Sequence, residues 1–229
     1  MRGRMHGTMG ALCLATLLGV SAASVAAPKT AAFSVTAVNA GPQGEVTITS
    51  KVWITPTQAR AEIKHPLQGD QIALVTNGFF YMLDPQSKQA IKQPLPEKIR
   101  KQPDNFELLF AKFAFDAPKQ PAAKKVRTES MSGYVCDVFS DTKTQGEATS
   151  TLTVWIPQSM TPKFPVKAIR AEKFSKPGAT MQNSISVTLS DIKLGATIPA
   201  SKFAVPAGYK YVTPPKQGAG KPAAKPGRR

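Results

Sequence analysis

One stretch, residues 70–84, limits the fold of this chain more than any other part of the sequence. Two apolar runs at 71–76 and 79–83 are separated by Asn77-Gly78. Asn and Gly both accept the positive φ angles of a type I′ turn, and such a pair between apolar runs is the strongest short-range signal for a hairpin. The stretch therefore predicts a β-hairpin.

Both faces of the predicted hairpin are apolar, so neither is suited to exposure to solvent. With a two-residue loop, residues directly opposite each other share a face of the hairpin. One face then carries Ile72 opposite Leu83 and Leu74 opposite Tyr81, and the other carries Ala73 opposite Met82 and Val75 opposite Phe80. An antiparallel sheet with one wet face alternates apolar with polar residues, so both faces of this hairpin need a cover.

Most of the remaining sequence has the period of β-strands. Alternating apolar and polar residues, with Pro and Gly between the runs, predict strands at 33–38, 46–54, 59–64, 89–93, 125–131, 133–141, 149–156, 166–174 and 184–192. Residues 198–203 are expected to form a short closing turn that anchors Phe203 and Val205. The pattern amounts to about ten antiparallel strands.

One segment has the period of a helix. Phe106, Leu109, Phe110 and Phe113 recur at i, i+3, i+4 and i+7, and Asp104 precedes them as an N-cap. This helix is about 18 Å long, whereas about ten strands give a sheet on the order of 45 Å wide. The helix cannot cover such a sheet, which is expected to curl.

The predicted fold class is mainly β with one or two helices. The strongly curved antiparallel sheet forms an incomplete, half-open β-barrel with a helical lid. The space between sheet and lid is expected to be a hydrophobic cavity that binds a ligand. Its predicted wall residues are Ile48, Val52, Phe80, Met82, Phe106, Leu109, Phe110 and Phe113. The alternative is that the Phe side chains simply pack together as core.

The two ends of the chain differ in composition from the middle. Residues 1–26 combine Arg2 and Arg4 with an apolar run and small residues before Pro28, which predicts a secretory signal peptide cleaved after Ala26. An uncleaved anchor is the alternative, but the run is short and rich in Gly, Ala and Ser. Residues 27–212 then form one β domain. Residues 213–229, rich in Pro, Gly, Ala and Lys, are expected to be a disordered basic tail.

Residues that carry catalytic chemistry are few. After the predicted signal peptide the chain has one cysteine, Cys136, which is expected to be a buried apolar residue, and one histidine, His65. No metal site, cofactor or phosphate-binding loop is predicted. A hydrolase that used Asp137 with Asp141, or Glu62 with Asp70, is the weakest hypothesis, because their spacing does not favour paired catalysis.

Several motifs resemble the LolA/LolB-like superfamily of periplasmic lipoprotein carriers, in an uncharacterised exported branch. They are VWITP at 52–56, ARAE at 59–62, NGFFYMLDP at 77–85, MSGYVC at 131–136, VWIP at 154–157 and IPASKFAVPAGY at 198–209. The resemblance spans about residues 45–211 and implies a LolA-like fold that holds acyl chains in a hydrophobic cavity. The sequence departs from dedicated carriers at Thr55, where they have an arginine, and in lacking their long first helix.

These observations lead to two hypotheses about function. The first is an exported, periplasmic, non-catalytic carrier or binder of a hydrophobic acyl-chain ligand such as a lipid or lipidated protein. The second is an envelope sensor or assembly module whose cavity is filled by its own side chains. With a net charge of +16, either the basic tail contacts an anionic membrane surface or the lysines merely keep the protein soluble. No specific nucleic acid partner is expected, and the protein is expected to be a monomer.

Overall fold

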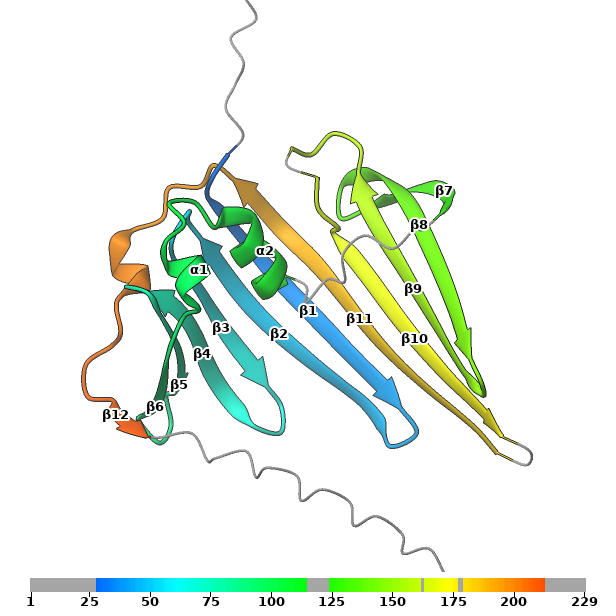
Figure 1. The fold of residues 1–229 in the computed structure, drawn as a ribbon, viewed down its shortest axis with the longest axis horizontal. Coiled ribbons are helices and arrows are strands. Elements are labelled where there is room, and N and C mark those ends of the chain that lie inside the picture. Colours follow the sequence, from blue (N-terminus) through cyan, green and yellow to red (C-terminus); the bar gives the residue numbers. More distant parts are fainter. Residues whose placement is uncertain (1–27, 115–123, 162, 177–178, 213–229) are drawn as a thin grey trace, which may run out of the picture.

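The computed structural model describes residues 28–114, 124–161, 163–176 and 179–212 (Figure 1). The strands are β1 (Ala31–Gly41), β2 (Gly44–Ile54), β3 (Ala59–His65), β4 (Gly69–Thr76), β5 (Phe79–Asp84), β6 (Gln89–Pro94), β7 (Lys124–Met131), β8 (Tyr134–Gln145), β9 (Ala148–Pro157), β10 (Lys167–Lys176), β11 (Ala179–Leu194) and β12 (Lys210–Val212). The helices are α1 (Glu97–Arg100), α2 (Phe106–Ala114) and a 3-10 turn, η1 (Ala200–Phe203).

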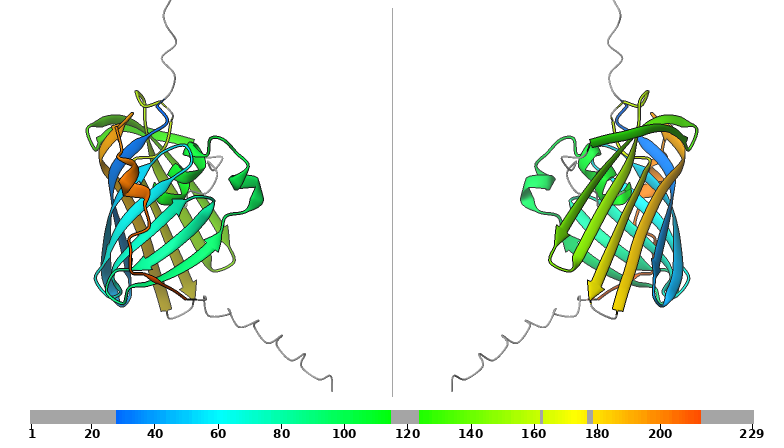
Figure 2. Two further views of the ribbon diagram at one scale, coloured as in Figure 1. Left: turned by 90° about the vertical axis from the view of Figure 1, so that its left-hand side faces the viewer. Right: turned by 90° about the vertical axis from the view of Figure 1, so that its right-hand side faces the viewer.

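All twelve strands belong to one sheet, in the order β12-β6-β5-β4-β3-β2-β1-β11-β10-β9-β8-β7. Every neighbouring pair is antiparallel except β12 with β6, which is parallel. The sheet curves toward the side on which α2 lies, and we call that side the concave face and the opposite side the outer face (Figure 2). The predicted fold class, a curved open sheet with a helical lid, is therefore confirmed.

The central hairpin has the predicted turn and register. Asn77 and Gly78 have φ angles of 50° and 76°, as a type I′ turn requires. Ile72 pairs with Leu83, Leu74 with Tyr81, Ala73 with Met82 and Val75 with Phe80. All four predicted cross-strand pairs are confirmed.

The concave face of the hairpin and its neighbours is covered by α2. Ala59, Ala61 and Ala73 line this face on β3 and β4 and are at most 6% exposed. They belong to the same apolar cluster as Phe106, Leu109 and Phe110 of the helix. Short alanine side chains let the helix backbone approach the sheet, so its aromatic side chains can fill the space.

The outer face of the hairpin is covered by the chain itself, with residues 198–212, which we call the closing segment. Phe203 of η1 is 3% exposed and packs with Leu74, Tyr81 and Leu83. Arg60 donates from Nη1 to the backbone oxygen of Lys202 at 3.1 Å. The predicted closing turn is confirmed, and no ligand is needed on this face.

Several details differ from the sequence-based expectations. The strands extend past their predicted ends because β-ladders continue through polar residues such as Thr142 and Thr144 at the far end of β8. Asp104 lies one residue before the N-cap, since the Leu109 amide donates to the oxygen of Asn105. The short helix α1, which buries no residue, had no apolar period that could reveal it.

The predicted signal peptide at 1–26 and basic tail at 213–229 lie outside the described residues. Within the described part of the chain, no helix has the length and apolar character needed to cross a membrane.

Phe203 gives a direct test of the closing segment. Phe203→Ala is expected to lower the free energy of unfolding by about 3–5 kcal/mol, because it empties the centre of the outer apolar cluster. Leu67→Ala, at a side chain 79% exposed, is the matched control and should change it by less than about 0.5 kcal/mol. Urea denaturation measures both. Equal, small effects would show that residues 198–212 do not fold cooperatively with the sheet.

Candidate functional site

The aromatic face of α2 closes one end of the concave face. Phe110 lies at the centre of this packing, with its ring centroid 4.8 Å from that of Phe33 on β1 and 3.8 Å from that of Phe164 in the β9–β10 connection. Phe106 lies 6.0 Å away on the previous turn of the helix. These contacts join residues far apart in the sequence and hold α2 across the strands (Figure 1).

The eight predicted wall residues fall into two groups. Val52, Phe106, Leu109 and Phe110 are at most 4% exposed, because they pack against each other under the helix. Phe80, Met82 and Phe113 are only partly buried and lie toward the margin of the same packing, and Ile48 is a partly buried residue of β2 outside it. A ligand could therefore touch the second group directly, whereas it would reach the first group only if α2 moved.

Beyond the helix, the concave face carries a continuous band of apolar side chains. Successive cross-strand pairs join residues that share this face on six neighbouring strands. We call this set the apolar row, and its members are Ile48, Ala37, Val187, Ala168, Val154 and Phe139. All except Val154 are partly exposed. At about 4.8 Å per strand the row is about 24 Å long.

Polar residues begin one step farther from the helix. Asn39 of β1 pairs with Val46 of β2 and with Ile185 of β11, and Ile185 pairs with Arg170 of β10. These four residues lie on the concave face, two residues along each strand from the apolar row. Glu172 lies on the same face, two residues farther along β10. These residues line a hollow of about 680 Å³ near the β1–β2 turn. Ile185 is 48% exposed there. The concave face thus changes from apolar to amphipathic with distance from α2.

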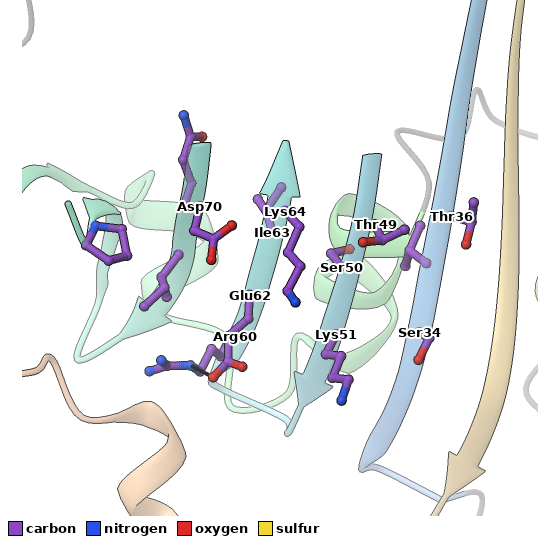
Figure 3. Close-up of a pocket in the computed structure, with 14 residues that line it drawn as sticks. Ser34, Thr36, Thr49, Ser50, Lys51, Arg60, Glu62, Ile63, Lys64 and Asp70 are labelled. Atoms are coloured by element: carbon purple, nitrogen blue, oxygen red, sulfur yellow. Dashed lines mark hydrogen bonds and ion pairs between the residues drawn. The ribbon is translucent and has the colours of Figure 1, made fainter. Parts of the chain in front are cut away.

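A second hollow, of about 580 Å³, lies on the outer face (Figure 3). Figure 3 shows Ser34, Thr36, Thr49, Lys51 and Lys64 projecting from β1, β2 and β3 on the side away from α2. The lining consists mainly of hydroxyl and charged groups. Its hydroxyl and charged groups are suited to polar ligand groups.

Arg60 belongs to this outer groove and has a structural role. Its guanidinium Nε donates to Glu62 at 3.0 Å and its Nη1 bonds the closing segment. Lys202 approaches the same Glu62 carboxylate at 3.5 Å and lies over the Trp53 ring at 4.1 Å. These contacts tie residues 198–212 to β3. The sequence showed Arg60 alternating with apolar neighbours but gave no sign of this distant partner.

Most of the candidate catalytic residues take part in structural contacts, and Asp70 lies with Glu62 in the lining of the outer hollow. His65 Nδ1 accepts hydrogen bonds from the amides of Leu67 and Gln68 in the β3–β4 turn. Asp137 and Asp141 are four residues apart on β8, about 13 Å in an extended strand, which is too far for a carboxylate pair that shares one substrate bond. Among the described residues, no group of three metal-binding side chains comes together.

The surroundings of Asp137 and Cys136 also indicate structural roles. Asp137 receives Lys125 at 2.7 Å and Gln158 at 2.7 Å, and these contacts keep the pKa of its carboxyl below the usual value. Cys136 is fully buried, as predicted, and desolvation raises the pKa of its thiol. A buried thiol with a raised pKa is a poor nucleophile at neutral pH.

No protein-family model matches the sequence, and no curated protein is similar to it. Solved structures do match. An uncharacterized conserved protein from Thermus thermophilus is 11% identical, with 79% of this chain and 90% of that chain covered and a TM-score of 0.45. Lipoprotein LppX from Mycobacterium tuberculosis is 14% identical, with 75% and 89% covered and a TM-score of 0.41.

A third solved structure also matches. A putative outer membrane lipoprotein-sorting protein domain from Vibrio parahaemolyticus is 10% identical, with 76% of this chain and 88% of that chain covered and a TM-score of 0.33. At these identities and TM-scores the likeness carries no information about the ligand or function of this chain.

The carboxylate of Asp104 stabilises the N-terminus of α2. Lys29 contacts the Asp104 carboxylate at 2.6 Å, and the Phe106 amide donates to it at 3.0 Å. These two contacts, the Lys29 one first, lower the pKa of Asp104 below its ordinary value of 3.8. The ionised carboxylate therefore stabilises the fold fully above that value, and this contribution is lost as the pH falls through the lower, folded pKa.

Asp104→Ala is accordingly expected to cost about 0.5–1 kcal/mol of unfolding free energy at neutral pH, the size of a lost hydrogen bond to an amide at the start of a helix. The difference from the unaltered protein should shrink as the pH falls below 3.8. Asp104→Asn keeps an acceptor for the amide, so it should lose less stability at neutral pH. Asp70→Ala, at an exposed carboxylate, serves as control. A difference for Asp104→Ala that is the same at both pH values would contradict this role.

Proposed function

We propose that this protein binds the hydrocarbon chain of a lipid or of a lipidated protein on the concave face of its sheet and carries it without chemical change. The observation that supports this most directly is the apolar row, which continues for about 24 Å beyond the area that α2 buries. Soluble proteins rarely expose an apolar band of this extent unless it binds something.

The proposal assigns different tasks to the eight predicted wall residues. Ile48, Phe80, Met82 and Phe113 contact the chain of the ligand at the edge of the lid. Val52, Phe106, Leu109 and Phe110 hold the lid on the sheet. Lys112 of α2 lies over the Phe80 ring, with its ammonium group 5.1 Å from the ring centroid, so the lid and this part of the wall are coupled.

The outer face supports the choice of the concave face. Its groove is lined by Ser34, Thr36, Thr49 and lysines, and its apolar hairpin surface is already covered by the closing segment. An acyl chain gains about 0.8 kcal/mol for each buried methylene, and the concave face has the apolar surface to supply this gain. We further propose that the protein acts outside the cytoplasm, after removal of residues 1–26.

A long-chain fluorescent fatty acid tests the proposal. Ile48→Gln and Val187→Gln are each expected to weaken its binding about tenfold, because each removes about 1.5 kcal/mol of apolar burial. The matched control is Val38→Gln, on the outer face of β1, where a partly exposed valine is replaced in the same way. Fluorescence titration gives the dissociation constants.

Chain length provides an independent measurement with the unaltered protein. Each added methylene should tighten binding about fourfold until the chain exceeds the site. Equal effects of Val38→Gln and Ile48→Gln, or affinity independent of chain length, would contradict the proposal. Lipid extraction of protein purified from its native envelope, followed by mass spectrometry, would identify the bound molecule.

A further inference from the structure

The amphipathic hollow at the far end of the concave face contains one positive and one negative side chain. Arg170 and Glu172 lie two residues apart on β10, so they project from the same face about 6.6 Å apart along the strand. Among the described residues, neither has an ion-pair partner within 4.0 Å. Both charges are therefore available to a ligand.

The surroundings of the two charges suit the part of a lipid where chain and head group meet. Val46, Met181 and Ile185 provide apolar surface, and Met181 and Ile185 are 54% and 48% exposed. Asn39 and Asn183 provide amides that can both donate and accept hydrogen bonds.

Gly41 makes room for one of these amides. A Cβ at this position would lie 2.9 Å from Oδ1 of Asn183, so a larger residue here would make the Asn183 side chain shift. The hollow also follows directly from the apolar row, because Arg170 is two residues from Ala168 on the same strand.

Resting on the function proposed above, we infer that the ligand is a zwitterionic lipid whose head group carries a phosphate and a primary ammonium group. The guanidinium of Arg170 presents a planar fork of donors that matches phosphate oxygens. The carboxylate of Glu172 accepts hydrogen bonds from the ammonium group, which has three N–H donors. The hydrocarbon chain then lies along the apolar row toward α2.

This arrangement discriminates between head groups. A choline head group has the same charges but no N–H to donate, so it loses the hydrogen bonds to Glu172. A glycerol head group offers Glu172 only neutral hydroxyl donors in place of an ammonium group, so it loses the charge-assisted hydrogen bonds and the lipid keeps a net negative charge beside this carboxylate. The structure therefore favours phosphatidylethanolamine over phosphatidylcholine and phosphatidylglycerol.

The test is displacement of the bound fluorescent fatty acid by short-chain, water-soluble forms of these three lipids. The ethanolamine lipid should displace it at about tenfold lower concentration than the other two, or less still, the size of one charge-assisted hydrogen bond. Glu172→Gln should abolish the preference for ethanolamine over choline. Arg170→Gln should weaken both of these lipids about equally, because both carry the phosphate.

Two substitutions elsewhere serve as matched controls. Lys173→Gln removes a positive charge from the other face of β10, and Glu45→Gln removes a negative charge from the outer face of β2. Neither should change the order of the lipids. If the fatty acid binds but Glu172→Gln leaves the ratio of ethanolamine to choline lipid unchanged, the inference is wrong and the proposed function stands. If no fatty acid binds at all, both are wrong.

Discussion

The contact between α2 and the alanines of β3 and β4 is the constraint on which the rest of the structure depends. Ala59, Ala61 and Ala73 leave a shallow area on the concave face, and Phe106, Leu109 and Phe110 fill it. Larger side chains at these positions would force the helix away from the sheet. Because α2 has nine residues and the sheet has twelve strands, this packing can seal only one end of the concave face. The apolar row beyond it remains within reach of a ligand.

The outer face of the hairpin, unlike the concave face, is covered by the closing segment. The hairpin is apolar on both sides, and residues 198–212 cover the side that α2 does not reach. Arg60 fixes this cover through Glu62 and the Lys202 backbone. The closing segment thus covers the apolar part of the outer face, and the neighbouring strands carry hydroxyl and charged groups there. The concave face keeps apolar side chains that α2 does not cover. The concave face therefore keeps an apolar row that is long enough to contact an extended hydrocarbon chain.

Much of this architecture was predictable because it follows from local patterns. The Asn77-Gly78 turn fixes the hairpin register, and strict alternation fixes which residues of β2 share a face. The helical period of Phe106 to Phe113 identifies α2. The candidate site was only partly predictable. Period alone could not tell Val52, which is fully buried, from Ile48, which is partly exposed four residues away on the same face, since burial depends on where α2 ends. The sequence did not mark Arg170 and Glu172 as site residues, because charged residues are common on strands.

The sequence by itself determined the elements of this protein: a hairpin apolar on both faces, a set of alternating strands, one amphipathic helix and a scarcity of groups suited to catalysis. These follow from turn chemistry and side-chain periodicity, which act over a few residues. The tertiary structure alone decided which partner covers each face, because that depends on contacts between residues more than a hundred positions apart, such as Arg60 with Lys202 and Ser34 with Asp191. It also decided that the apolar row ends next to Arg170 and Glu172 of β10, because the row exists only when six strands are paired in this register.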